Sequence, residues 1–293
     1  MSRPIPDAIL KSLDRLDPLP ITVHNVLRIL SDPRTSIARI ADVIEHDQAI
    51  AASVLRLSRT MAYGGCATIS TVREAVLRLG TATLLDMVLG EYLRRVSVAA
   101  PMYRLTEDDL WLHGAASQLA VKAIVAERPG CDVPLMATTA ALVHDIGKLL
   151  MVRHLKVDVS VILRHCATYQ VTFVEAERAL FGTDHAAVGA AMARSWQFPA
   201  PITRAIEEHH DAEISDPTPI IDAVVTANFV TKTIGVGLGA EGLNLRVDPA
   251  CLERLGLDFE AFGRVCVQTS VWLDEVKRAH GVGAPARAAA TGR

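Results

Sequence analysis

The chain has 293 residues, of which half are hydrophobic, 4% are aromatic and 22% are charged, a composition typical of packed helices rather than sheets. The formal net charge of -3 excludes a net basic field that would hold a phosphate backbone, so we expect no nucleic-acid partner. No stretch reads as an uncharged membrane span or a signal peptide, so we expect a cytoplasmic protein without a membrane partner.

The first hundred residues carry the apolar spacing of short amphipathic helices. Apolar side chains recur at intervals of three and four residues, which predicts helices over 21–30, 35–47, 49–59, 70–80 and 81–96. Asp47 is placed to cap the third of these helices, and Ser70 or Thr71 to cap the fourth. We therefore expect a small N-terminal helical bundle over residues 1–100.

After Pro101 the pattern changes to longer and more strongly apolar segments. Their spacing predicts helices over 106–127, 133–152, 157–169, 173–180, 184–196, 200–210, 219–235 and 259–279. We expect a second helical bundle over residues 101–280, packed on the first, and a flexible tail over residues 281–293. The predicted fold class is therefore all-α.

Histidine and aspartate side chains gather on apolar segments of the second bundle. The dipeptide His-Asp occurs at 46–47, 144–145 and 210–211, so it is not a signal by itself. A single histidine in an apolar helix is more often a core residue than a ligand. Several that arrive from different helices can be satisfied together only inside a bundle, and a divalent cation is their simplest common partner. The candidate metal ligands are His113, His144, Asp145, His185, His209 and His210.

The segments that carry these residues resemble a known family. LWLHGAASQLA, ALVHDIGKLLM and HAAVGAAMARSWQFPAPITRAIEEHH follow one another in the order of the HD phosphohydrolase superfamily. Together with LDPLPITVHNVLRILSD and ISTVREAVLRLG, they resemble the HDOD (HD-related output domain) family of bacterial signalling proteins, over about residues 13–235. The resemblance implies a helical N-terminal part packed on an HD-domain-like bundle, and signalling through contacts with other proteins rather than dependable hydrolysis.

The sequence lacks a signature of an active relative. Related HD-GYP proteins of the superfamily that this sequence resembles cleave cyclic di-GMP at a site of two or three metals. The GYP tripeptide is absent after His210, where the sequence reads DAEISDPTP.

Two positions depart from the family pattern. Asn228 stands where active HD enzymes place a further aspartate, so one unit of charge compensation is missing, and we expect weaker metal binding and still weaker turnover. Arg59-Thr60 replaces an asparagine-serine pair that is common in the family. This departure affects the expected detail of the connection between the N-terminal bundle and the second bundle, and it does not affect the expected fold.

Two further residues have alternative interpretations. Asp109 can add a carboxylate to the site or cap its helix together with Thr106, and we favour the cap. Lys148 can hold a substrate phosphate, which makes it the candidate catalytic residue, or lie in solvent near a helix end, which we favour narrowly. The remaining histidines, at 24, 46, 154, 165 and 280, are predicted to be surface or packing residues.

Two functional hypotheses follow. The favoured one is a signalling module that acts through protein partners and keeps a degenerate HD site, which is able to hold a divalent metal such as iron, manganese, zinc or nickel. The alternative is a metal-dependent phosphohydrolase or cyclic-dinucleotide phosphodiesterase, whose metal would acidify a bound water and polarise a phosphoryl oxygen. In that case the ligand is a cyclic dinucleotide or another phosphate compound. Asn228 and the missing GYP favour the first hypothesis.

Overall fold

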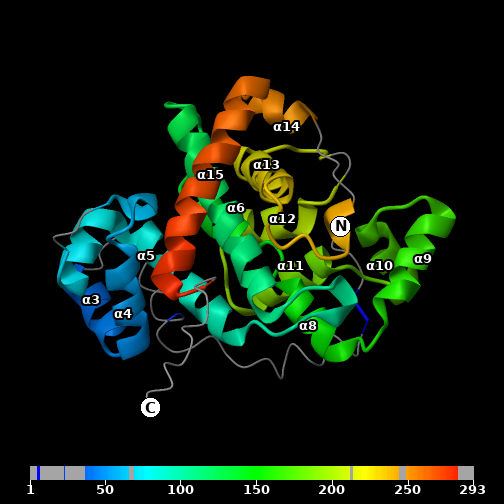
Figure 1. The fold of residues 1–293 in the computed structure, drawn as a ribbon, viewed down its shortest axis with the longest axis horizontal. Coiled ribbons are helices and arrows are strands. Elements are labelled where there is room, and N and C mark those ends of the chain that lie inside the picture. Colours follow the sequence, from blue (N-terminus) through cyan, green and yellow to red (C-terminus); the bar gives the residue numbers. More distant parts are fainter. Residues whose placement is uncertain are drawn as a thin grey trace, which may run out of the picture.

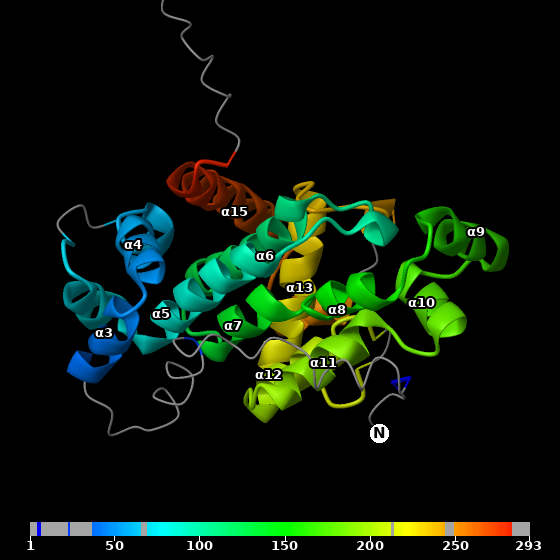
Figure 2. The same cartoon turned by 90° about the horizontal axis from the view of Figure 1, so that it is seen from below.

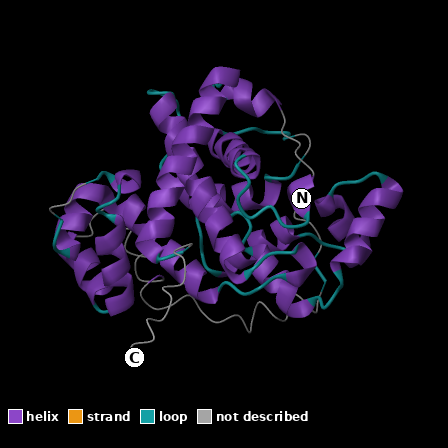
Figure 3. Ribbon diagram, in the orientation of Figure 1, coloured by secondary structure: helices purple, strands orange, loops and turns teal. Residues whose placement is uncertain are grey.

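The protein is helical throughout the part of the chain that is described. The computed structural model describes residues 5–6, 23, 37–65, 69–211, 214–243 and 249–282. Over these ranges it contains α-helices, short 3-10 helices and one isolated antiparallel bridge between Ala100 and Leu105, with no strand (Figure 3). The predicted all-α fold class is confirmed.

The N-terminal helices pack against one another at one end of the molecule (Figure 1). They are α3 (Ile37–Glu45), α4 (Gln48–Leu57) and α5 (Val72–Val96). Two predicted caps are confirmed, because Asp47 accepts hydrogen bonds from first-turn amides of α4, and Thr71 forms a capping box with Glu74 at the start of α5. The predicted helices over 70–80 and 81–96 form one element with non-helical backbone at Gly80. The predicted helix over 21–30 lies almost wholly outside the described residues.

The Arg59-Thr60 pair lies at the turn after α4. The Arg59 guanidinium donates two hydrogen bonds to the Ile69 carbonyl, at 3.2 and 3.1 Å, and the Thr60 hydroxyl donates one to the Leu57 carbonyl. A short 3-10 helix, η1 (Met61–Tyr63), follows. Arg59 therefore ties the end of α4 to the segment just before α5, while the Thr60 hydroxyl bonds back onto α4.

The remaining helices build the larger part of the molecule. They are α6 (Glu107–Glu127), α7 (Met136–Val143), α8 (Gly147–His154), α9 (Val159–Tyr169), α10 (Phe173–Phe181), α11 (His185–Ser195), α12 (Ala200–Glu208), α13 (Pro219–Thr233), α14 (Pro249–Arg254) and α15 (Phe259–His280), with 3-10 helices η2 (Pro101–Tyr103) and η3 (Glu241–Leu243). The predicted helix over 133–152 is interrupted after Val143 and divides into α7 and α8. α14 was not predicted.

α6 lies at the centre of this part. It contacts α7, α13 and α15, while α12 packs against α7, and α11 packs against both α8 and α12 (Figure 2). α6 is buried from Leu110 to Val121 without a break, which explains why it lacks a polar face. α5 packs against both α6 and α7 and joins the N-terminal helices to the rest.

The expected division into residues 1–100 and 101–280 stays a prediction. Residues 283–293, most of the expected tail, lie outside the described residues. None of the helices in the described ranges combines the length and the apolar character that a membrane span requires.

Candidate metal centre

The predicted metal ligands converge inside the larger part of the molecule. They come from α6 (His113), from the break between α7 and α8 (His144 and Asp145), from the first residue of α11 (His185) and from the end of α12 (His209 and His210). They form two groups, and Asp145 belongs to both. One group also contains His113 and His144, and the other also contains His185, His209 and His210. Within each group the ligand atoms lie within 4.8 Å of one another. Segments far apart in the sequence therefore meet at one point.

The Asp145 carboxylate lies at the centre of this cluster. Its Oδ1 is 3.3 Å from His185 Nε2 and 3.6 Å from His209 Nε2, and its Oδ2 is 3.5 Å from His144 Nε2 and 3.6 Å from His113 Nε2. Ligand atoms bound to one ion at about 2.1 Å lie about 3.0–3.4 Å apart in octahedral or tetrahedral geometry. The observed separations are close to those of a shared coordination shell.

Two of the imidazoles are oriented by the helices that they end. His144 Nδ1 lies 2.7 Å from the Ala141 carbonyl, and His209 Nδ1 lies 2.7 Å from the Ile206 carbonyl, in each case three residues back along the chain. A carbonyl only accepts, so each Nδ1 must carry the hydrogen, and the unprotonated Nε2 is the atom that faces Asp145.

Two further imidazoles of the five are oriented by remote segments. His113 Nδ1 lies 3.0 Å from the Val236 carbonyl, and His185 Nδ1 lies 2.7 Å from Glu177 Oε2. The second Glu177 oxygen accepts a hydrogen bond from the Tyr103 hydroxyl. Metal-binding histidines usually donate their other ring nitrogen to a carbonyl or carboxylate, and these four imidazoles follow this rule.

Three inward-facing atoms have no hydrogen-bond partner among the described residues. They are His144 Nε2, His209 Nε2 and Asp145 Oδ1, and each is buried. A buried polar atom without a partner costs about 1–3 kcal/mol, so such atoms are uncommon in folded proteins. A cation at this point would satisfy all three, so the residues present fit a metal.

Glycines allow the helices to approach closely enough to form the cluster. A Cβ at Gly147 would lie 1.9 Å from the His185 carbonyl oxygen, and a Cβ at Gly114 would lie 2.5 Å from the Leu142 carbonyl oxygen. The first contact brings α8 onto α11, and the second brings α6 onto α7. The glycine of the HDIGK segment therefore serves the packing that places Asp145 beside His185.

Burial sets the charge of most of the imidazoles. It lowers the pKa of His113, His144, His209 and His210. These rings are therefore neutral near pH 7, as metal binding requires. His185 behaves differently. Burial would lower its pKa as well, but the Glu177 carboxylate and Asp145 raise it to about 10.

The Asp145 carboxylate is ionised although it is buried. Burial alone would raise its pKa, but the Lys148 ammonium holds it well below its usual range. Lys148 Nζ lies 2.8 Å from Asp145 Oδ2 and 2.9 Å from Glu241 Oε1. The interpretation of Lys148 as a solvated residue is wrong, because its side chain is only 5% exposed and pairs with two carboxylates.

Three charged residues of the site were not predicted from the sequence. They are Glu177, Lys232 and Glu241, which lie in α10, α13 and η3. Each belongs to a segment that carries none of the candidate histidines, so nothing in the local sequence links these charges to His185 or Lys148. Only the approach of their segments in the folded chain reveals the contacts.

The remaining predictions concern residues around the cluster. Asn228 is buried, and its Oδ1 lies 3.2 Å from His113 Nε2, so it faces the site as expected. The cap is confirmed for Asp109, whose carboxylate accepts hydrogen bonds from the backbone and hydroxyl of Thr106. His210 lies at the edge, with its Nε2 3.0 Å from His185 Nε2.

Four of the five histidines outside the pattern are described, and these four lie outside the cluster. His46 is exposed, His165 lies against Tyr169, and His280 packs on Trp111 with ring centroids 5.0 Å apart. His154 is exposed, and His24 lies outside the described residues.

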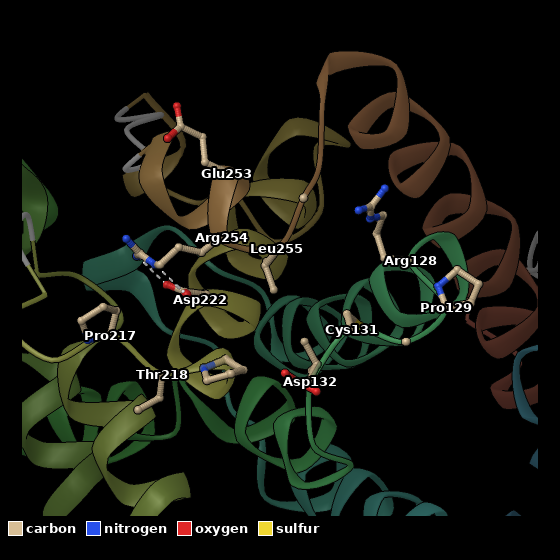
Figure 4. A pocket seen from close by; sticks show the side chains of 14 residues that line it. Arg128, Pro129, Cys131, Asp132, Pro217, Thr218, Asp222, Glu253, Arg254 and Leu255 are labelled. Carbon is tan, nitrogen blue, oxygen red and sulfur yellow. Dashed lines mark hydrogen bonds and ion pairs between the residues drawn. The ribbon is translucent and has the colours of Figure 1, made fainter.

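A separate polar pocket lies beside α14. It has a volume of about 430 Å³ and is lined by the loop after α6, the start of α13 and α14 (Figure 4). Arg254 lies in it and forms a bidentate ion pair with Asp222, at 2.6 and 2.8 Å. No predicted ligand lines this pocket, so the histidine cluster is distinct from it.

Known proteins resemble this chain over most of its length. An HDOD domain protein of unknown function from Geobacter sulfurreducens is 26% identical, with 93% of this chain and 97% of that chain covered and a TM-score of 0.70. A candidate signal transduction protein from Marinobacter aquaeolei VT8 is 21% identical, with 92% of this chain and 60% of that chain covered and a TM-score of 0.71.

A curated relative is longer than this chain. It is an uncharacterised protein of Treponema pallidum, 22% identical over 77% of this chain, and the chain spans 44% of its length. A family model described as HDOD domain matches residues 16–212, a range that includes every predicted ligand. Because this match covers more than half of the sequence, the chain belongs to the HDOD domain family.

Proposed function

We propose that this HDOD protein is a signalling module that acts through contacts with other proteins and holds a divalent metal in its interior. The main support for a metal is the set of buried histidine Nε2 atoms that face the Asp145 carboxylate. Two of these atoms, in His144 and His209, have no hydrogen-bond partner among the described residues. Bound there, a metal would supply a Lewis acid that lowers the pKa of a water ligand.

The two groups of ligands suit one ion or two. Asp145 belongs to both groups, so its carboxylate can bridge a pair of ions, with His113 and His144 on one side and the other histidines on the second side. A site of imidazoles with one carboxylate suits zinc, iron, nickel or manganese. The Lys148 ammonium, 2.8 Å from Asp145 Oδ2, helps to hold this carboxylate in place.

Two features support signalling over turnover. Asn228 offers His113 a neutral amide where an aspartate would add charge, so a metal here is less well compensated. Lys148 is the one residue that the sequence predicts could hold a substrate phosphate, and its ammonium is already paired with the Glu241 carboxylate. The Marinobacter protein, which shares the fold, is described as a candidate signal transduction protein, in agreement with this proposal.

Metal analysis tests the proposal directly. The purified protein, reconstituted with iron, manganese, zinc or nickel, is expected to retain at least one of them after desalting, and His144→Ala is expected to lose it. His46→Ala is the matched control, because it removes a histidine from another His-Asp dipeptide that is exposed. A wild-type protein that retains none of these metals would contradict the proposal.

The signalling role requires a separate experiment. Cross-linking in bacterial cells that express the protein is expected to capture a signalling protein with the wild type and with His46→Ala. His144→Ala, without its metal, is expected to capture less. Equal capture by all three forms would show that the metal does not serve partner binding.

Hydrolysis is the second candidate, favoured by the buried ammonium of Lys148 beside the metal centre. A generic phosphodiester and cyclic di-GMP are the substrates to test, with each metal restored. We expect no turnover above that of His144→Ala. Metal-dependent turnover that His144→Ala abolishes would instead establish a phosphohydrolase.

Asn228 offers a further test of the metal. Asn228→Asp is expected to tighten metal binding by about tenfold, the lower end of the effect of a group next to the ligands. The added carboxylate would lie beside His113, where the amide oxygen lies now. Unchanged affinity in a calorimetric titration would mean that position 228 does not influence the metal.

A further inference from the structure

A carboxylate from a loop occupies the space beside the metal centre. Glu241 is 6% exposed, and its Oε1 lies 2.9 Å from Lys148 Nζ, while its Oε2 lies 3.8 Å from Lys232 Nζ. The side chains of both lysines are largely buried, at 5% and 11% exposed. Two ammonium groups that face one carboxylate form a binding position for an anion.

The charges around this position balance only while an anion is present. Lys148 and Lys232 bring two positive charges, and Asp145 and Glu241 bring two negative ones. If Glu241 left, one buried positive charge would remain uncompensated, which is strongly unfavourable. Departure of Glu241 is therefore coupled to the arrival of another anion.

Glu241 is the first residue of the short 3-10 helix η3, at the end of the loop that follows α13. The loop follows α13 and is held by the Val236 carbonyl, which accepts from His113, and by the Ala240 amide, which donates to the Tyr103 carbonyl at 2.7 Å. Gly239 has φ of +48°, and a Cβ there would lie 2.2 Å from the Tyr103 carbonyl oxygen. The glycine is thus needed for the loop to lie this close.

We propose that Glu241 is a built-in competitor for an oxyanion of the phosphate class, which binds between Lys148 and Lys232 when the loop withdraws. This inference rests on the proposed signalling function. In that function the oxyanion is the signal, and its binding moves the loop. Because the Val236 carbonyl in the same loop orients His113, withdrawal of the loop also changes the support of a metal ligand. An anion at the lysines and a metal at the histidines are thereby coupled.

Removal of the competing charge tests the inference. Glu241→Gln is expected to bind inorganic phosphate at least about tenfold more tightly than wild type in calorimetry, because the fraction of open sites rises. Glu260→Gln removes a carboxylate that is 87% exposed on α15, and it should leave phosphate affinity unchanged. Acetate in place of phosphate should give a smaller response. An equal response to acetate would overturn the assignment to the phosphate class.

A second variant displaces the loop without changing any charge. Gly239→Ala should push the loop from Tyr103 and raise phosphate affinity in the same direction as Glu241→Gln. The hydrogen exchange of residues 235–242 in the wild type should also rise when phosphate is added. Phosphate affinity that neither variant changes, with loop exchange that phosphate does not alter, would overturn the inference.

The metal is measured apart from the anion. Each titration is run on metal-free and metal-loaded protein, and metal content is determined separately. Loss of metal binding with a normal phosphate response in the variants would refute the metal proposal alone. Normal metal binding without that response would refute only the role of Glu241.

Discussion

Two His-Asp dipeptides occupy the same kind of local structure and have different surroundings. His46-Asp47 lies in the break between α3 and α4, and His144-Asp145 lies in the break between α7 and α8. In both, the histidine Nδ1 faces a carbonyl of the helix that ends there, Asp42 in one and Ala141 in the other.

The carboxylates differ because their surroundings differ. Asp47 remains partly exposed and caps α4 through the amides of Ala49 and Ile50. Asp145 is 5% exposed and faces imidazoles from other helices and the Lys148 ammonium. The same dipeptide at a break between helices therefore serves as a helix cap at the surface and as the centre of a candidate metal site in the interior.

The largest effect should separate the two aspartates. Asp145→Asn is expected to weaken metal binding by more than about 100-fold, since even the loss of an outer-shell partner costs 10–100-fold. Asp47→Asn should change neither metal affinity nor stability, because asparagine caps helices as well as aspartate does. Calorimetric titration of both variants with zinc measures the difference, and similar affinities would remove the distinction between the dipeptides.

The support of His185 provides the next test. Glu177→Gln is expected to reduce metal affinity by about 10–100-fold, because it removes the carboxylate that fixes the ring. The neighbouring Glu175→Gln serves as the control, since Glu175 caps α10 through Thr172 and lies at the surface. If both variants bound metal as the wild type does, Glu177 would have no part in the site.

The pH dependence follows from the charge of His185. Its pKa is raised to about 10, so the metal-free ring holds a proton that must leave before the ring can bind a metal. Metal affinity should therefore rise by about tenfold per pH unit between pH 7 and pH 9, with a proton released on binding. Titrations in buffers of different ionisation enthalpy detect that proton, and a flat profile would mean that His185 is not a ligand.

The smallest effect concerns the surface dipeptide. Asp47→Ala should lower the free energy of unfolding by about 1 kcal/mol, because α4 loses its N-cap. Metal affinity should stay the same. Urea unfolding with and without zinc measures both quantities. A large loss of metal binding in this variant would tie the N-terminal helices to the site.

Caps and helix ranges were predictable because their causes are local. Thr71 and Glu74 lie within one turn, and Asp47 lies beside the amides that it caps, so a short window of sequence contains both partners. The break between α7 and α8 was missed, since the apolar spacing continues across His144 while the backbone turns. Packing of Gly147 on α11 accompanies that turn.

The order of the histidines and the HDIGK segment indicated the candidate ligands, and these segments together with the N-terminal ones indicated the family. Their roles as ligands stay a proposal. The tertiary structure decided that Lys148 is buried between Asp145 and Glu241, and that Glu177 and Lys232 belong to the same site. Charges interact through space over a few ångströms, and the sequence records neither the distance nor the burial that determines their strength.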